Sequence, residues 1–536
     1  LSRGAGMPVS QNTEVSNRSY GAYFNDDWKL SRRVTINLGL RYEYEVPFHE
    51  AQNRLPRALD LSVPIPALQG ANAPQMPAAV KQYYNGPWIF NGAFQWQGGS
   101  HPGAWDGGLG TLSPRAGIAL RLNDKTAVRV GWGRFITPWL AITNMTAANA
   151  YGFNVTTPAL PFVQGVPQLN LDDPFPASYP IQAAPGKSLG ASTGLGDSLT
   201  YFNADRPRQH TDRYSLSVQR QLPLGITAEF TGLMTFSNNV ITRNLNQVDP
   251  RIAYTYKAAT NVQVPNPFYN LLPASQFPGP LGRQASVNLT SLMVPYPQYG
   301  SLTVTDYGGN GGDHFQQLAM KFRKAYSYGL TLMGGYAYLR SRSLTYYDDI
   351  ATYLQQQTWQ ESTSPRHQVS LAGNWEIPLG HGRAFLNAMP RIMDAALGGW
   401  AVSPLLTWRS GNYLSFGGLL ASGDPHVSDP GPGGWFNTAV FAKLPAYTPR
   451  TNPITYSGLT GPGYFNLDVS FAKSFRVTER FSAVLRMDVF HAPNNMTWND
   501  PSTSVTSTYF GKSSGQFNPY GLGIGRQTQI GLRVRF

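Results

Sequence analysis

The sequence predicts an all-β fold, a transmembrane antiparallel β-barrel with short turns at one end and long loops at the other. Three observations predict it. Apolar and polar side chains alternate along stretches longer than the roughly five or six residues of an ordinary strand. These stretches pair as hairpins across short turns, and long segments rich in Gly, Pro, Asn and Ser separate the hairpins.

The alternation is clearest in residues 33–46. One face of this stretch carries Val34, Ile36, Leu38, Leu40, Tyr42, Tyr44 and Val46, and the other carries Arg33, Thr35, Asn37, Gly39, Arg41, Glu43 and Glu45. Successive side chains of a strand point to opposite faces, so a repeat of two residues predicts a strand with one apolar and one polar face. In a membrane barrel these faces meet lipid and the lumen.

The strands group into six predicted hairpins. They join residues 18–30 with 33–46, 114–122 with 126–137, 212–222 with 225–238, 314–325 with 328–341, 366–377 with 397–410, and 463–475 with 480–492. The segments between them are 47–112, 138–211, 239–313, 342–365, 411–462 and 493–524. Loops above about 15 residues are uncommon in compact soluble domains, whereas membrane barrels combine short periplasmic turns with long extracellular loops.

A last predicted strand ends the sequence. In it, Ile530, Leu532, Val534 and Phe536 alternate with Gln529, Gly531, Arg533 and Arg535. A terminal strand that finishes in Phe resembles the segment that the bacterial barrel assembly machinery recognises. Six hairpins and this strand make about 13 strands, but single-chain bacterial barrels have even numbers because a free edge cannot lie in lipid. We therefore expect residues 1–536, which begin without Met, to be part of a larger barrel.

Composition argues against several other classes of protein. Charged residues make up 13% of the chain, about half the usual share of roughly 25%. No run approaches the roughly 18 apolar residues of a transmembrane helix. The absence of Cys excludes disulfides, thiolate zinc sites and cysteine nucleophiles. The net charge of +13 is spread along the chain without a long basic run, so no nucleic-acid partner is expected.

Short motifs give no reason to expect an enzyme. Gly186-Lys187-Ser188-Leu189-Gly190 fits a nucleophile-elbow pattern, but that motif needs a strand before the Ser and a helix after it, and neither is predicted. The eight His residues have no metal-binding spacing. The acid pairs Asp172-Asp173 and Asp348-Asp349 could bind a cation or a sugar, although solvated loop acids are the commoner explanation. No catalytic, metal or cofactor residue is predicted.

Three further sets of side chains match parts of a membrane barrel. Aromatic girdles at the headgroup level are expected from Trp28, Trp132, Trp375, Trp400 and Trp408. A basic periplasmic rim is expected from Arg32, Arg33, Arg121, Lys125, Arg323, Lys324, Arg476, Arg480, Arg533 and Arg535. The predicted substrate-contacting surface consists of the loop aromatics Tyr346, Tyr347, Tyr353, Trp359, Trp435 and Phe436.

The order of several segments resembles TonB-dependent receptors. Residues 20–29, 35–44 and 113–117 resemble successive barrel motifs of that superfamily. Residues 214–222, 243–247, 295–300, 365–368, 435–441 and 461–468 resemble more specifically the Oar-like barrels abundant in acidobacteria and myxobacteria. The resemblance covers nearly the whole chain.

The resemblance implies a 22-strand barrel, a plug, and a carboxypeptidase-regulatory-like domain ahead of the plug. Residues 1–536 would then be the C-terminal part of the barrel, with about nine strands, the plug and the regulatory-like domain upstream. The implied function is uptake of a scarce solute, a siderophore, glycan or peptide, across the outer membrane, powered by TonB-ExbB-ExbD through the plug. Outer-membrane lipid and lipopolysaccharide would surround the barrel. A passive porin-like channel and a surface or adhesion protein remain alternatives.

Overall fold

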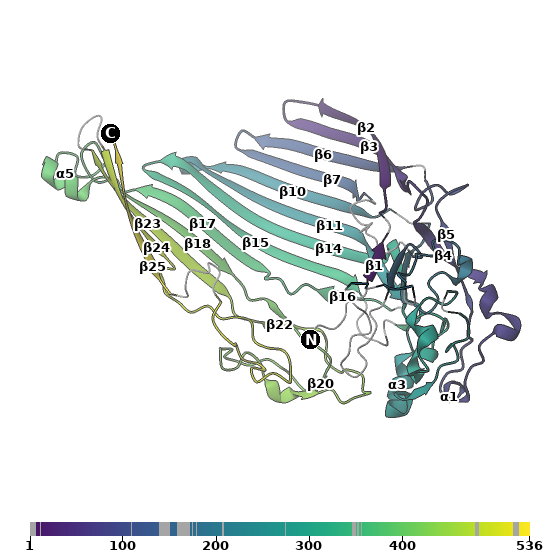
Figure 1. Ribbon diagram of the computed structural model, residues 1–536. Coiled ribbons are helices and arrows are strands. Elements are labelled where there is room, and N and C mark those ends of the chain that lie inside the picture. Colours follow the sequence, from purple (N-terminus) through teal and green to yellow (C-terminus); the bar gives the residue numbers. More distant parts are fainter. Residues whose placement is uncertain are drawn as a thin grey trace.

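One large antiparallel sheet dominates the fold (Figure 1). The computed structural model describes residues 7–10, 12–108, 110–138, 151–157, 172–173, 175–177, 180–205, 208–273, 275–345, 350, 353–354, 356–476, 482–517 and 525–536. The helices are short: α1 (Ala78–Lys81), α3 (Pro250–Tyr256) and α5 (Arg391–Leu397). Within the described residues, no helix is both long and apolar enough to cross a membrane.

The sheet has 15 strands, and 13 of them follow one another in sequence order. The other two, β9 and β16, pair with β14 and β15 at the margins of the sheet. They are β2 (Val15–Lys29), β3 (Val34–Glu50), β6 (Thr111–Asn123), β7 (Thr126–Ile136), β10 (His210–Leu222), β11 (Ile226–Asn244), β14 (Leu302–Ser327), β15 (Leu330–Thr345), β17 (His367–Glu376), β18 (Trp400–Arg409), β23 (Tyr464–Arg476), β24 (Ser482–Phe490) and β25 (Gln527–Arg535). All six predicted hairpins are confirmed.

The strand register produces the predicted apolar face. Ile36 lies opposite Trp28 on one side and Ile118 on the other, and Ile118 in turn lies opposite Val130. Ile118 and Val130 are about half exposed, at 50% and 52%. Rows of exposed apolar side chains on a long sheet are typical of the surface that a membrane barrel turns to lipid.

Two central strands are longer than their alternation predicts. β14 begins at Leu302 rather than near residue 314, and β11 continues to Asn244. The two stay paired past an irregularity between Asn239 and Ile241. The start of β14 also pairs in parallel with β9 (Leu199–Phe202). The two extensions pair with each other beyond the apolar band, and β14 pairs there with β9 as well, so the period of two does not reveal them.

Small strand pairs stiffen the long loops. In sequence order the short strands are β1 (Met7–Ser10), β4 (Pro56–Pro64), β5 (Asn91–Trp96), β8 (Asn154–Thr157), β12 (Gln263–Pro265), β13 (Ser286–Asn288), β16 (Thr358–Glu361), β19 (Tyr413–Ser415), β20 (Leu419–Ala421), β21 (Phe441–Lys443) and β22 (Thr455–Thr460). β4 pairs with β5, β12 with β13, β19 with β22, and β20 with β21.

Three of the long loops fold together into what we call the outer cap, formed by described parts of residues 47–112, 151–204 and 239–304. Its core contains Leu68, Leu195, Phe268, Phe277 and Tyr299, all at most 2% exposed. In Figure 1 the cap gathers around β4, β5, α1 and α3 at one end of the sheet. Among the described residues, the largest hydrophobic core therefore lies in the loops, as expected if the two faces of the sheet meet lipid and a lumen.

A second, smaller loop core lies in the later loops. It consists of Leu414, Phe416, Leu419, Phe436, Phe441 and Leu459. The rings of Phe416 and Phe441 stack with their centroids 5.0 Å apart. Aromatic clusters of this kind bury much apolar area per residue, so this loop region also has an ordered interior.

Candidate functional site

The polar face of the sheet is lined by side chains that pair with one another, both within a strand and across strands. On β3, Arg41 donates to Glu43 with 2.8 Å between Nη2 and Oε1. Farther along the sheet, the Ser217 hydroxyl donates to Glu229 over 3.2 Å. Charges on this face stay exposed enough to meet water, as the lumenal wall of a barrel requires.

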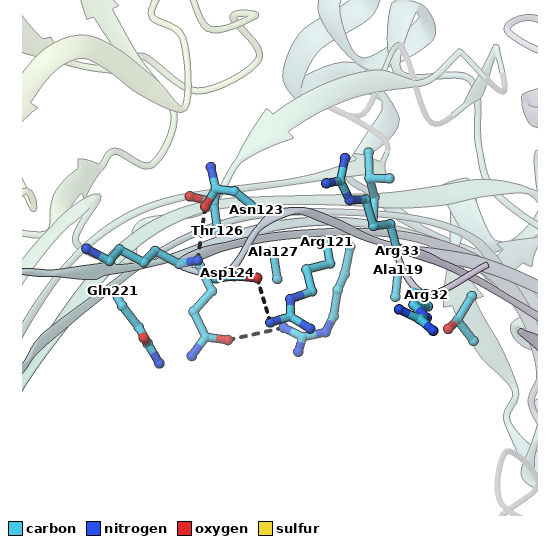
Figure 2. Close-up of a pocket in the computed structure, with 14 residues that line it drawn as sticks. Arg32, Arg33, Ala119, Arg121, Asn123, Asp124, Thr126, Ala127 and Gln221 are labelled. Atoms are coloured by element: carbon cyan, nitrogen blue, oxygen red, sulfur yellow. Dashed lines mark hydrogen bonds and ion pairs between the residues drawn. The ribbon is translucent and has the colours of Figure 1, made fainter.

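A basic pocket lies on this face at the short-turn end of β2, β3, β6, β7 and β10 (Figure 2). Its volume is about 320 Å³, and five basic residues and one acid line it. The basic residues are Arg32, Arg33, Arg121, Lys125 and Arg129, and the acid is Asp124.

The basic pocket is held open by local contacts. The Arg121 Nη2 atom lies 2.9 Å from Asp124 Oδ1, and Arg129 donates to Gln219 over 3.3 Å. The Lys125 backbone N–H donates to Asn123 over 3.0 Å, which shapes the tight turn between β6 and β7. One carboxylate cannot neutralise five cations, so the pocket attracts anions or an acidic surface.

The predicted basic rim gathers at this same end of the strands. Arg323 and Lys324 lie near the end of β14, and Arg533 and Arg535 lie near the end of β25. Arg480 is outside the described residues. The rim therefore extends beyond the basic pocket along the short-turn end of the sheet.

The five predicted girdle tryptophans lie on the apolar face near strand ends. Trp28, Trp375 and Trp400 are at the short-turn end, and Trp132 and Trp408 are at the loop end. Tryptophan favours the two interfaces of a bilayer, where its ring is half wet. The band between these two rows is the segment that lipid would cover.

The predicted substrate-contacting residues do not form one cluster. Tyr346 and Tyr347 lie outside the described residues. Tyr353 is 36% exposed, and its ring lies 5.7 Å from the guanidinium of Arg251 in the outer cap. Trp359 lies in β16 opposite Leu344, on the apolar face of the sheet rather than the lumenal one.

Two other members of that set belong to the second loop core. Phe436 is 3% exposed and packs against Phe416, with ring centroids 5.2 Å apart. The neighbouring Trp435 donates from its indole nitrogen to the Ser513 hydroxyl over 2.7 Å. The sequence predicts a surface position for Phe436 because loops are usually exposed. This prediction is wrong, since packing between two loops places Phe436 in a core.

The surroundings of Tyr353 are charged. Arg251 contacts Asp249 with 2.6 Å between Nη2 and Oδ2. Burial alone would raise the pKa of Asp249, but the bonds that it accepts from the Arg251 side chain and backbone outweigh burial and lower this pKa. The ion pair therefore persists at neutral pH and holds the guanidinium beside the Tyr353 ring.

The nucleophile-elbow motif and the first acid pair lie in loops. Ser188 donates its hydroxyl to the Pro185 carbonyl over 2.7 Å, within a run of turns. Asp172 and Asp173 are exposed, and Asp348 and Asp349 lie outside the described residues. Across the part of the chain that the structure describes, no group of three or more His, Asp or Glu residues is arranged to hold a metal ion.

Sequence comparison identifies the family. A family model described as an outer membrane beta barrel domain matches residues 2–529. The chain belongs to this family. The all-β antiparallel fold and the outer-membrane location that the sequence predicts are thereby confirmed for this outer membrane β-barrel. No curated protein matches it in sequence.

Solved structures of outer-membrane transporters are similar to this outer membrane β-barrel. The transporter YddB from Escherichia coli aligns with 97% of this chain and 45% of its own at 9% identity and a TM-score of 0.43. The ferripyoverdine receptor of Pseudomonas aeruginosa aligns with 98% and 39% at 9% identity and a TM-score of 0.38. The ferric-catecholate import receptor Fiu from E. coli aligns with 98% and 45% at 11% identity and a TM-score of 0.40. The chain spans less than half the length of these proteins.

Proposed function

We propose that this chain is the C-terminal part of the barrel of a TonB-dependent receptor of the Oar-like type. In the whole receptor it would supply barrel wall and outer loops, and a plug and a carboxypeptidase-regulatory-like domain would come from upstream sequence. The outer loops would bind a scarce solute, a siderophore, glycan or peptide. TonB-ExbB-ExbD would then drive uptake by acting on the plug.

One observation carries this proposal: in the described residues the sheet has two edges, β2 and β25. Both edge strands turn apolar side chains outward, for example Phe24 at 68% exposure and Ile530 at 69%. An unpaired strand edge in lipid leaves backbone N–H and C=O groups without partners, which costs several kcal/mol per group. Further strands that join β2 to β25 would remove both edges, and about nine would complete the 22 of this receptor type.

The lumenal side supports the same proposal. The basic pocket faces the lumen at the short-turn end, where an acidic surface of a plug or an anionic solute would find complementary charge. We assign the lumen to the plug because an acidic plug surface would complement the five cations of the basic pocket.

For solute contact we favour the region around Tyr353 and Arg251. An exposed phenol ring beside a guanidinium offers stacking, hydrogen bonding and positive charge to a ligand. Phe436 is better explained as a core residue, and Trp359 as a residue of the outer surface of the barrel. Tyr346 and Tyr347 remain candidates on sequence grounds.

The final strand fits the proposed contact with the barrel assembly machinery. Ile530 and Leu532 of β25 are 69% and 67% exposed, and Phe536, which follows the strand, is 99% exposed. β25 lies at a sheet edge. An apolar edge strand can pair with a strand of another protein before the barrel closes. This contact would be transient, because closure by the upstream strands would take the same edge.

Uptake experiments on the complete gene test the proposal. Deleting the gene is expected to abolish uptake of one labelled iron chelate, glycan or peptide, and deleting TonB is expected to abolish uptake but leave surface binding intact. Uptake that survives TonB deletion and collapse of the proton gradient would indicate a passive channel. Normal uptake of every solute after gene deletion would favour a surface or adhesion role.

A variant pair tests the binding region. Tyr353→Ala is expected to weaken solute binding to whole cells several-fold. Leu354→Ala, at a neighbouring side chain that is 43% exposed, is the matched control and should bind normally. Equal binding by the two variants would remove Tyr353 from the proposed site.

A further inference from the structure

The connection between β17 and β18 differs from the other described short-turn connections. It runs from residue 377 to 399 and contains α5. In Figure 1 it projects from the same end of the sheet as the C-terminus. The connection is a folded unit, because the His381 backbone N–H donates to Asp394 over 2.7 Å and the Gly382 N–H donates to Asn387 over 2.6 Å.

Lys473 fixes α5 to the membrane side of the sheet. The register places Lys473 of β23 opposite Trp400 of β18, on the apolar face. Lys473 is nevertheless 3% exposed, because its ammonium group donates to the Gly398 carbonyl at the end of α5. Carbonyl groups at a helix C-terminus are free to accept such a bond and favour a cation.

Aromatic contacts complete this attachment. The Lys473 ammonium lies 5.7 Å from the Trp400 ring and 5.2 Å from the Phe475 ring. The Trp400 indole N–H donates to the Ala396 carbonyl in α5 over 3.0 Å. A lysine on the lipid face would be costly without partners, and α5 supplies them. The helix therefore sits beside the apolar band on its outer side.

The outer surface of this connection is strongly apolar. The exposed fractions are 86% for Ile392, 50% for Met393, 44% for Leu397, 61% for Phe385 and 55% for Leu386. Asp394, the acid of α5, points inward and accepts the bond from His381. Five exposed apolar side chains on one short connection are more than scattered surface residues explain.

We propose that α5 and Phe385-Leu386 insert into the lipid leaflet at the short-turn end, as an interfacial anchor that binds phospholipid at the boundary between headgroups and acyl chains. Lipid is the occupant because the surface continues the apolar face at Trp400 and Trp375, the girdle at this end. Tyr326 and Tyr328 of the adjacent turn, 58% and 85% exposed, extend the same interfacial row. Helices with one apolar and one polar side bind membranes in this way.

This inference uses the outer-membrane location and does not depend on solute uptake or on TonB. Under the proposed orientation the leaflet is the periplasmic one. Because the anchor connects β17 and β18, which are interior strands of the sheet, it is separate from the edges β2 and β25 that upstream strands would join. Its failure would therefore leave the receptor proposal standing.

The experiment places a fluorescent label on a single cysteine, Ile392→Cys, in the full-length protein purified into phospholipid nanodiscs. The expected result is a blue-shifted emission and strong quenching by lipids brominated near the headgroup. Quenching by iodide should be several-fold weaker than for the same label at a water-exposed position. Ala258→Cys in the outer cap is the matched control, exposed to water, and should be quenched by iodide and not by brominated lipid.

A second variant separates anchoring from folding. Lys473→Met removes the bond to α5 and is expected to reduce bromolipid quenching of the label at position 392. Folding of each variant is checked by the heat-dependent mobility of the barrel in detergent gels. If the label on folded Ile392→Cys is quenched by iodide as strongly as the control, or is not quenched by brominated lipid, the anchor does not exist.

Discussion

Replacing Phe268 by alanine is expected to open the outer cap while the barrel stays folded. Phe268 is fully buried, and its ring centroid lies 6.2 Å from those of Trp88 and Phe90 and 6.0 Å from that of Phe277. Truncating a buried Phe costs about 3–5 kcal/mol. Since each ~1.4 kcal/mol is a factor of ten, the population of opened caps should rise on the order of 100- to 4,000-fold.

Limited proteolysis of the full-length protein in detergent measures this opening. New cleavage sites should appear within residues 47–112 and 239–304, at a rate that follows the opened population. Tyr269→Ala, which truncates the adjacent and 46% exposed side chain, is the control and should be cut at the wild-type rate. The reasoning fails if both variants are cut equally fast, or if the barrel loses its heat-dependent gel mobility together with the cap.

Three further predictions test the faces, a turn and a loop. Met320→Arg, on the apolar face and 59% exposed, should destabilise the barrel by about 2–4 kcal/mol in lipid, whereas Gln317→Arg on the polar face should have little effect in urea unfolding. Gly329→Ala should lower the barrel melting temperature, because Gly329 has φ of +78° and an added Cβ would lie 2.5 Å from a backbone oxygen. The Asp424 carboxylate bonded to His426 raises the pKa of that imidazole, so the pair should stabilise its loop most below pH ~6.5 and lose this contribution as pH rises through the raised pKa. The measurement is hydrogen exchange near residue 457 at pH values between about 5.5 and 8.5, expressed as protection relative to the intrinsic exchange rate at each pH. This protection would show no trend if the pair contributes nothing.

The strand ladder was predictable from sequence because its cause is local. Residues 33–46 alternate because successive side chains point to opposite faces of the strand, one toward lipid and the other toward the lumen. The polarity of each residue therefore depends on its own position in the strand. The turn at Asn123-Asp124-Lys125 likewise follows from the preferences of its own residues. The candidate solute site was less predictable. Trp359 and Phe436 are both aromatic loop residues in sequence, but one lies on the outer face of the sheet and the other in a core between loops.

Contacts between residues far apart in the chain determine features that the alternation of apolar and polar residues does not predict. Phe268 packs against Trp88, and Lys473 reaches the carbonyl of Gly398, contacts that no local period encodes. By itself the sequence determined the all-β class, the six hairpins, the two faces of the sheet and the apolar final strand, because strand polarity depends on neighbours two residues apart. Only the tertiary structure decided that three loops share one core, that basic residues of two neighbouring turns and of β7 line a single pocket, and that α5 packs beside Trp400. Those features depend on contacts between side chains of separate loops and strands. Which of these side chains can meet depends on which segments the sheet places next to one another.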